Sequence, residues 1–306
     1  MSATAATFDR RDSVDLAATI IMLLLTASWG LNGVAAKLSY AGFNPIFVSI
    51  ARSTIGGGLV FLWARYRGVK LFERDGTLLP GLLAGLLFTA EFVFIYVGLE
   101  YTSAARAALM LNTMPFWVLI GAYFLLGERI SGTKVAGLVL AFGGVVLVFS
   151  DKLSSLGPDA IIGDAMNFVG GALWAATTLV IKRSRLNSAP AEKLLLYQLG
   201  VSAVASLPLL AFAGPALRDV TWLPAGALLF QAIYVVAITY VVWFWLMTRY
   251  PASGLSSFAF LTPAFGVLFG TLILHEPFSL RILAALALIG IGLIIVNRPQ
   301  PRKAGA

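Results

Sequence analysis

Residues 29–37 read WGLNGVAAK and residues 174–182 read WAATTLVIK, so a tryptophan is followed by a lysine eight residues later in each half of the chain. Each half also carries a proline that is followed thirteen residues later by a glutamate: Pro115 and Glu128, then Pro263 and Glu276. The tryptophan recurs after 145 residues, and the proline and the glutamate each recur after 148 residues. The sequence therefore predicts two copies of one unit.

The composition indicates a membrane protein. Of the 306 residues, 59 % are hydrophobic and only 12 % are charged, whereas about a quarter of the residues of a soluble domain are charged. The chain has no cysteine and one histidine, which excludes disulfides, thiolate chemistry and most zinc or histidine-dependent catalytic sites. The net charge of +8 comes from short loops between apolar runs, which favours membrane topology over nucleic acid as its explanation.

Ten apolar runs have the length of about 20 residues that a helix needs to cross a bilayer. They are residues 16–36, 45–64, 78–98, 104–125, 134–150, 161–181, 191–213, 222–246, 252–274 and 280–297. A unit that crosses five times must be followed by a copy in the opposite orientation. The predicted fold is an all-α membrane protein with ten transmembrane helices in two inverted five-helix repeats. The predicted parts are an N-terminal segment (1–15), the first repeat (16–150), a connecting loop (151–160), the second repeat (161–297) and a tail (298–306).

Basic residues predict the orientation of these helices. When the loops are assigned alternately to the two sides, sixteen Lys and Arg residues fall on one side and five on the other, with Arg52 inside a span. Loops rich in Lys and Arg face the cytoplasm. Both termini are therefore predicted to be cytoplasmic.

Two sets of residues follow one another in a similar order in the two halves. The first set is Ser28 to Asn32 with Lys37, Pro45 with Arg52, Tyr101 to Ala104, Pro115, Leu126 to Arg129 and Gly143 with Gly144, and the second is Trp174, Lys182, Tyr250, Pro263, His275 with Glu276, and Gly290 with Gly292. Their order resembles the drug/metabolite transporter superfamily in its EamA-type ten-helix branch, and within it the bacterial aromatic amino acid exporters of the YddG type. The resemblance implies a central cavity lined by helices one, three, four, six, eight and nine, with helices five and ten at the periphery. It also implies export from the cytoplasm across a bacterial inner membrane.

Five candidate site residues lie at matching depth in the first four predicted helices. At about 1.5 Å per residue they are roughly 6 to 12 Å below the outer interface: Trp29, Asn32, Arg52, Glu91 and Asn112. An ionised side chain at that depth has to face protein or water and have a partner. Arg52 and Glu91 can form a structural ion pair, or Glu91 can face the cavity and either take up protons during transport or hold a substrate ammonium group.

The repeat maps this layer onto residues of the second half that are expected near the inner interface. The counterparts, in the same order, are Trp174, Thr177, Tyr197, Tyr240, and Phe260 or Leu261. Charged residues are replaced by aromatic ones, which predicts a cavity with a charged outer part and an aromatic inner part. Such a cavity suits an amphipathic substrate, with Trp174 as a candidate gate.

Two prolines interrupt the predicted helices four and nine. Pro115 and Pro263 each remove a backbone hydrogen bond and free a carbonyl group, which is tolerated in a membrane only against protein or a water-filled cavity. They are either packing kinks or a pair of hinges for alternating access.

In the eighth predicted helix, Gln231 and Tyr240 are candidates for the cavity lining, Trp243 is either a lining residue or an interfacial anchor, and Trp245 is an anchor. Glu128 and Glu276 are expected to have structural roles at helix ends. His275 is expected at an interface.

Three functions are compatible with a polytopic protein of this kind. The first is export of small amphipathic metabolites, aromatic and other large neutral amino acids foremost, and the second is efflux of drugs or lipophilic cations with broad specificity. The third, an intramembrane enzyme, lacks the His-Glu-x-x-His and Gly-x-Ser-x-Gly motifs. The expected partners are a small-molecule substrate and the lipid bilayer, with no nucleic acid and no cofactor. Proton coupling and oligomeric state remain open.

Overall fold

The computed structural model of the protein describes residues 11, 13–102, 104–150, 160–274 and 280–298. The first half forms α1 (Leu16–Tyr40), α2 (Pro45–Tyr66), α3 (Leu78–Tyr101), α4 (Ala104–Leu111), α5 (Met114–Gly121), the π-helix η1 (Ala122–Leu126) and α6 (Gly132–Phe149). The second half forms α7 (Ala160–Arg183), the 3₁₀ turn η3 (Arg185–Ser188), α8 (Ala191–Ala205), the 3₁₀ turn η4 (Leu207–Ala211), α9 (Trp222–Phe230), the π-helix η5 (Gln231–Thr239), α10 (Tyr240–Arg249), α11 (Ala252–Ser257), the 3₁₀ turn η6 (Phe258–Phe260), α12 (Leu261–Leu274) and α13 (Leu280–Val296).

Each of the ten predicted spans coincides with one of these helices or with a run of them. Among the described residues, nine helical segments are long and apolar enough to cross a membrane, and a tenth apolar helix, Leu283–Val296, is shorter. The prediction of an all-α membrane fold is confirmed. The first helix is longer than predicted because it continues to Tyr40.

Side chains at the helix starts explain several boundaries. The first N–H groups of a helix have no partner within the helix. Asp15 accepts a hydrogen bond from the N–H of Ala18, and Asn44 accepts one from that of Ile46. Pro45 follows Asn44 at a position where its missing N–H costs nothing. These short polar residues therefore fix the starts of α1 and α2.

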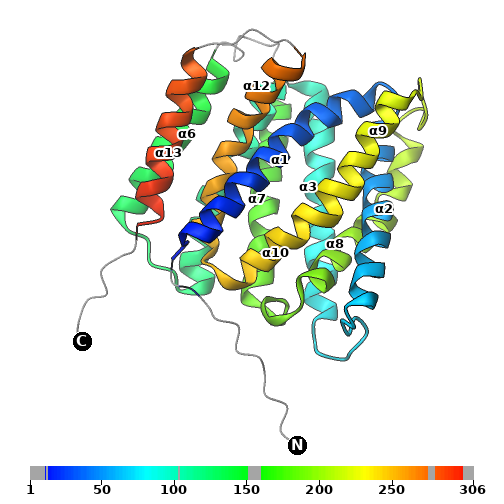
Figure 1. Ribbon diagram of the computed structural model, residues 1–306, viewed down its shortest axis with the longest axis horizontal. Helices are drawn as coiled ribbons and strands as arrows, with labels where there is room; N and C mark the ends of the chain where they lie inside the picture. Colours follow the sequence, from blue (N-terminus) through cyan, green and yellow to red (C-terminus); the bar gives the residue numbers. More distant parts are fainter. Residues whose placement is uncertain (1–10, 12, 103, 151–159, 275–279, 299–306) are drawn as a thin grey trace, which may run out of the picture.

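Equivalent helices of the two halves make equivalent contacts. The second helices, α2 and α8, pack against each other, and so do the fifth helices, α6 and α13. The third helix of the first half, α3, contacts the first helix of the second half, α7, while α1 contacts α9. Figure 1 shows α6 and α13 side by side at one edge of the bundle. This reciprocal pattern relates the two repeats by an approximate twofold axis.

The start of α1 and the end of α13 lie at the same face of the helix bundle. In Figure 1, α1 begins and α13 ends at the lower edge of the bundle, and Val14 and Asn297 both approach Gly254. We call this end the termini face; it also contains residues 67–77, 127–131, 184–190 and 250–251. The opposite face contains residues 41–44 and 212–221, where Asn44 bonds to the backbone of Ala213. A chain that starts and ends at the same face crosses an even number of times.

A loop on the termini face joins the two repeats. Lys193 of α8 donates a hydrogen bond of 2.7 Å to the carboxylate of Asp75, which also accepts bonds from the hydroxyl and the N–H of Thr77. Burial raises the pKa of Asp75, but the hydrogen bonds from Lys193 and Thr77 outweigh it and lower the pKa to about 2. The carboxylate is therefore ionised at neutral pH and ties the start of α3 to α8.

Glycines allow α6 and α13 to approach closely. A Cβ atom on Gly292 would lie 2.6 Å from the carbonyl oxygen of Gly137 and 2.7 Å from the nitrogen of Ala141, both of them backbone atoms. Small residues at such crossings let two membrane helices pack backbone to backbone. Gly290, two positions away, would place its Cβ with no atom within 4 Å.

We expect Gly292→Val to destabilise the protein by about 1–3 kcal/mol, because the added atoms force the two backbones apart. The matched variant Gly290→Val adds the same atoms where there is space and should leave the melting temperature in detergent close to that of the parent. Equal melting temperatures for the two variants would contradict this packing.

Candidate functional site

A cavity of about 360 Å³ lies between the two repeats. Its walls come from α1, α3, α4 and α7, from η5 and α10 of the eighth predicted span, and from η6 and α12, and these elements belong to the helices that the resemblance implied. Arg52 of α2 and Gln198 of α8 also reach it. The peripheral helices α6 and α13 supply none of its lining residues.

The structure brings nearly all the candidate site residues together. The cavity is lined by Trp29, Asn32, Arg52, Glu91, Asn112, Trp174, Thr177, Gln231 and Tyr240. Phe260 is the exception, because its ring is fully buried against Phe116 and Phe142, with ring centroids 6.1 and 6.2 Å away. Its neighbours Ala259 and Thr262 line the cavity instead.

Arg52 is the buried cation of this site. Its guanidinium donates a 3.0 Å hydrogen bond to the hydroxyl of Tyr240 and lies 4.9 Å from the centroid of the Phe92 ring. It also interacts electrostatically with the carboxylate of Glu91. The sequence predicted that the charged and the aromatic parts of the cavity would be separate. The structure differs, because the hydroxyl of Tyr240 reaches the guanidinium of Arg52.

Trp29 organises an aromatic wall beside this cation. Its indole N–H donates a 3.0 Å hydrogen bond to the hydroxyl of Thr239. Its ring makes edge-to-face contacts with Tyr240 and Trp243, at centroid distances of 6.3 and 5.5 Å. Trp243 is therefore a lining residue, and only 6 % of it is exposed. Trp245 is more exposed and stacks beneath the guanidinium of Arg249.

Four buried polar atoms of the cavity lining have no hydrogen-bond partner within the described part of the chain. They are Asn32 Oδ1, Glu91 Oε2, Gln198 Nε2 and Thr262 Oγ1. A buried polar atom without a partner costs about 1–3 kcal/mol. Four of them around one cavity mark a site that is built to bind polar groups.

Both predicted prolines lie next to interruptions of their helices. Pro115 follows the break between α4 and α5, and Pro263 follows the 3₁₀ turn η6. A proline frees the carbonyl four residues before it, which belongs to Leu111 in one case and to Ala259 in the other. Both residues line the cavity. The helix interruptions therefore face the cavity in both repeats.

A π-helix that the sequence did not predict occupies the middle of the eighth span. Residues 231–239 form η5 between α9 and α10. Gln231 at its start donates a 3.0 Å hydrogen bond to Ser39 of α1, and Thr239 at its end accepts the bond from Trp29. Widened turns of this kind often accompany functional sites. Here η5 connects the cavity wall to α1 at both of its ends.

The cavity is closed toward the termini face. Its lining residues at that end are almost fully buried: Met247 is 1 % exposed, Thr178 is 2 % and Ala259 is 5 %. Toward the opposite face the lining continues along α1 through Gly33 and Ala36 to Tyr40, which are partly exposed.

Gln198 is a lining residue that the repeat comparison missed. The comparison mapped Arg52 onto Tyr197, but the hydroxyl of Tyr197 bonds to Thr77 at the termini face. Gln198 is 1 % exposed and turns to the cavity instead. An amide inside an apolar helix is itself a signal, since polar residues within membrane spans face the bundle interior.

The first helix of each repeat has a carboxylate near its start, Asp15 before α1 and Asp164 within α7. At the termini face, Asp15 accepts a 2.9 Å hydrogen bond from the hydroxyl of Tyr250, which belongs to the other repeat. At the opposite face, Asp164 accepts a 2.7 Å bond from Thr102 and pairs with Arg106, again across the repeats. We call these contacts the Asp15 latch and the Asp164 latch.

Hydrogen bonds determine which group of the Asp15 latch carries the proton. The N–H of Ala18 lowers the pKa of Asp15, and the Tyr250 hydroxyl lowers it further against the effect of burial. Burial and the bond to Asp15 raise the pKa of Tyr250. The carboxylate is thus the acceptor and the phenol the donor at neutral pH.

Glu128 has the structural role expected of it. Its carboxylate accepts hydrogen bonds from the N–H of Ala252 and the hydroxyl of Ser253, and it lies 3.8 Å from Lys134. It therefore joins the turn before α6 to the start of α11. Glu276 and His275 lie outside the described residues.

Comparison with known proteins agrees with this architecture. A family model described as the EamA-like transporter family matches residues 16–150 and 161–298. The chain belongs to the EamA-like transporter family. The site is therefore the central cavity of an EamA-like membrane transporter.

This EamA-like transporter is similar over most of its length to transporters from several organisms. It is 28 % identical to the uncharacterized transporter YvbV of Bacillus subtilis, with 94 % of each chain covered. It is 26 % identical to a probable amino-acid metabolite efflux pump of Escherichia coli, covering 90 % of this chain and 93 % of that one. A solved crystal structure with 21 % identity superposes with a TM-score of 0.80 over 91 % of this chain and 96 % of the other, which shows the shared fold.

Two substitutions in the cavity of this EamA-like transporter should change its stability in opposite directions. Gln198→Met removes a buried amide nitrogen that has no partner among the described residues and should stabilise the ligand-free protein by about 1 kcal/mol. Tyr240→Phe removes a hydrogen bond to a buried cation and should destabilise it by about 1.5–3 kcal/mol. Thermal unfolding in detergent measures both, and a destabilised Gln198→Met variant would show that the amide has a partner.

Proposed function

We propose that this EamA-like transporter exports small amphipathic metabolites, aromatic and other large neutral amino acids foremost, by alternating access through the central cavity. The cavity itself carries the proposal, because aromatic walls and unpartnered polar atoms surround a guanidinium and a carboxylate there. Its volume of about 360 Å³ falls within the usual range for small-molecule sites.

The two ends of an amino acid fit different parts of this cavity. Arg52 supplies a cation for the substrate carboxylate, while Glu91 Oε2 and Asn32 Oδ1 are acceptors for the ammonium group. Trp29 and Trp174 offer flat apolar surfaces for the side chain. A relative described as a probable amino-acid metabolite efflux pump supports this substrate class.

Efflux of lipophilic cations is the second candidate. The unpartnered oxygen of Glu91 favours it, since a buried acceptor beside aromatic rings suits an organic cation. The two functions differ in their need for Arg52, because an organic cation has no carboxylate to bind.

The membrane side follows from the basic residues. We assign the termini face to the cytoplasm of a bacterial inner membrane, because Lys and Arg are concentrated in its loops. The two repeats then have opposite orientations. Pro115 and Pro263 are proposed as the hinges, because the helix interruptions beside them meet the cavity at Leu111 and Ala259.

Uptake of labelled phenylalanine or tryptophan into proteoliposomes tests the proposal, with and without a pH gradient. We expect saturable uptake that other large neutral amino acids compete with, and a loss of at least about tenfold in Arg52→Gln from one charged hydrogen bond. If uptake needs the gradient, Glu91→Gln should abolish that dependence. Glu73→Gln, which neutralises an exposed loop carboxylate, is the control and should transport normally.

The outcomes separate the candidates. Uptake of an organic cation that survives Arg52→Gln but not Glu91→Gln would favour cation efflux. Gradient-independent uptake of amino acids by Glu91→Gln would make the protein a facilitator in which Glu91 is structural. No uptake above empty liposomes would refute amino acid transport.

The two latches should control opposite faces of the transporter. Tyr250→Phe removes the bond across the repeats to Asp15, and Thr102→Val removes one of the bonds to Asp164. Because the chain has no cysteine, a single cysteine at Thr178 can report access from the termini face. We expect Tyr250→Phe to increase the rate at which an impermeant maleimide labels this cysteine from the termini face by about tenfold. Thr102→Val should leave that rate unchanged. Equal effects of both variants would refute separate control.

A further inference from the structure

Two side chains of the central cavity carry polar atoms that no described residue satisfies. They are Gln198 of α8, through Nε2, and Thr262 of α12, through Oγ1. Gln198 is only 1 % exposed, so bulk water does not replace the missing partner. We call these two residues the inner polar pair.

Residues of the same types elsewhere in the lining are already hydrogen bonded. The amide nitrogen of Gln231 donates both to the hydroxyl of Ser39 and to the carbonyl of Ala227. The hydroxyl groups of Thr177 and Thr178 donate to carbonyl groups of the preceding helical turn, as threonine often does within a helix. The inner polar pair therefore differs from these neighbours, because it keeps hydrogen-bonding capacity for a ligand.

Helix packing gives the depth of Gln198 relative to Arg52. A Cβ atom on Gly57 of α2 would lie 3.4 Å from that of Leu199, so Gly57 and Leu199 are level. Gln198 adjoins Leu199, and Gly57 lies five residues from Arg52 toward the termini face. At about 1.5 Å per residue, the backbone of Gln198 is therefore about 8 Å nearer to the termini face than that of Arg52.

A second pair of helices gives the same depth for Thr262. A Cβ atom on Gly30 of α1 would lie 2.7 Å from the nitrogen of Gly266 of α12, so these two residues are also level. Both helices run from the termini face to the opposite face. Asn32 lies two residues beyond Gly30, and Thr262 lies four residues before Gly266. The backbone of Thr262 is therefore about 9 Å nearer to the termini face than that of Asn32.

The cavity thus has polar groups at two levels, with an aromatic wall between them. Arg52 and Asn32 belong to the outer level, and the inner polar pair forms the inner one. Trp29 lies three residues from Asn32 along α1, which is half of the way to the level of Thr262. A ligand that satisfies both levels has to be polar at both ends and flat and apolar in the middle.

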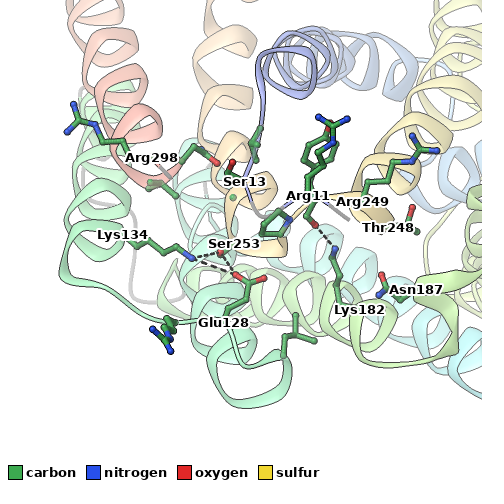
Figure 2. Close-up of a pocket in the computed structure, with 18 residues that line it drawn as sticks. Arg11, Ser13, Glu128, Lys134, Lys182, Asn187, Thr248, Arg249, Ser253 and Arg298 are labelled. Carbon is green, nitrogen blue, oxygen red and sulfur yellow. Dashed lines mark hydrogen bonds and ion pairs between the residues drawn. The ribbon is translucent and has the colours of Figure 1, made fainter. Parts of the chain in front are cut away.

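Figure 2 shows the face that closes the cavity beyond the inner polar pair. Lys134 of the first repeat donates to the hydroxyl of Ser253 of the second repeat, and that hydroxyl donates to Glu128. The pocket that these residues line shares no described residue with the central cavity. The inner polar pair therefore lies at a closed end, where solvent from the termini face does not supply its hydrogen bonds.

We propose that the inner polar pair recognises the phenolic hydroxyl of a hydroxylated aromatic amino acid, so that the transporter binds tyrosine in preference to phenylalanine. This preference rests on the proposed function, because the amino and carboxylate groups of the substrate occupy the outer level. The distance between the two levels is close to the length of a tyrosine molecule from its charged groups to its phenolic oxygen.

A phenol satisfies both members of the inner polar pair at once. Its oxygen accepts a hydrogen bond from the amide of Gln198, and its O–H donates to the hydroxyl oxygen of Thr262. Phenylalanine fills the same space and leaves both groups unpaired. A site that binds a substrate hydroxyl discriminates against the analogue without it, because its own buried polar groups then lack partners.

The test measures the melting temperature of the purified protein in detergent against ligand concentration. The ligands form two matched pairs, tyrosine with phenylalanine and tyramine with phenethylamine, and the members of each pair differ by one hydroxyl group. The amine pair has no carboxylate, so it tests the inner polar pair even if the protein carries organic cations rather than amino acids.

We expect tyrosine to reach half-maximal stabilisation at a concentration about tenfold lower than phenylalanine does. Gln198→Met should abolish this difference by weakening the binding of tyrosine alone, and Thr262→Val should reduce it. The matched controls Gln231→Met and Thr178→Val change the same residue types at positions that are already bonded. Whatever they do to overall affinity, they should keep the ratio between the two amino acids.

Each outcome decides the proposal. Equal binding of tyrosine and phenylalanine by the parent overturns the preference and leaves amino acid transport standing. A hydroxyl preference that appears only in the amine pair supports the inner polar pair and refutes amino acids as the substrate. No stabilisation by any of the four ligands, or the same loss of ratio in the control variants, overturns the recognition of a hydroxyl group here. If Gln198→Met does not fold, an unchanged ratio in Thr262→Val has the same meaning.

Discussion

A guanidinium within the hydrocarbon-spanning part of a helix bundle has to be solvated by the protein itself. Arg52 is only 4 % exposed and lies in α2, and its surroundings come from both repeats. Phe92 and Glu91 approach from α3, and the hydroxyl oxygen of Tyr240, from α10, accepts a hydrogen bond from the guanidinium. Satisfying this one cation places an aromatic ring, a carboxylate and a hydroxyl around a shared space. The central cavity is the part of that space which the protein does not fill.

The cavity also depends on backbone that departs from the regular α-helix. Such departures are tolerated at membrane depth only where protein or a cavity satisfies the freed groups. The break before Pro115, the 3₁₀ turn before Pro263 and the π-helix η5 all occur in helices that line the cavity. The peripheral pair α6 and α13 is regular and closely packed through Gly292 instead. Interrupted backbone thus occurs in helices that line the cavity, whereas Asn32, Arg52 and Glu91 reach it from the regular helices α1, α2 and α3.

The sequence predicted those features that depend on the residue composition of a whole segment. Apolar length predicted the ten spans, and polar residues in apolar runs, such as Asn32 and Glu91, predicted most of the polar residues of the cavity lining. It did not predict features that depend on the rotation of one helix against another. The sequence predicted Phe260 in the cavity and mapped Arg52 onto Tyr197, whereas Ala259 and Gln198 line the cavity. Both errors are shifts of one residue, and one residue turns a side chain by about 100° around the helix axis. The π-helix η5 escaped prediction because the interior of its sequence is mostly apolar and it carries no glycine or proline.

The two latches show how repeats of one unit come to differ in function. Asp15 and Asp164 lie near the starts of α1 and α7, but Asp15 reaches the other repeat through a phenol, whereas Asp164 does so through a hydroxyl and a guanidinium. An ion pair that is hydrogen bonded and partly buried resists separation more than a single bond does. From this difference we expect the face held by the Asp164 latch to open less easily at equilibrium. The difference does not set the direction of net transport, because a shifted equilibrium between two conformations speeds both directions or neither. Direction has to come from a gradient across the membrane, either of the substrate or of an ion whose movement is coupled to it.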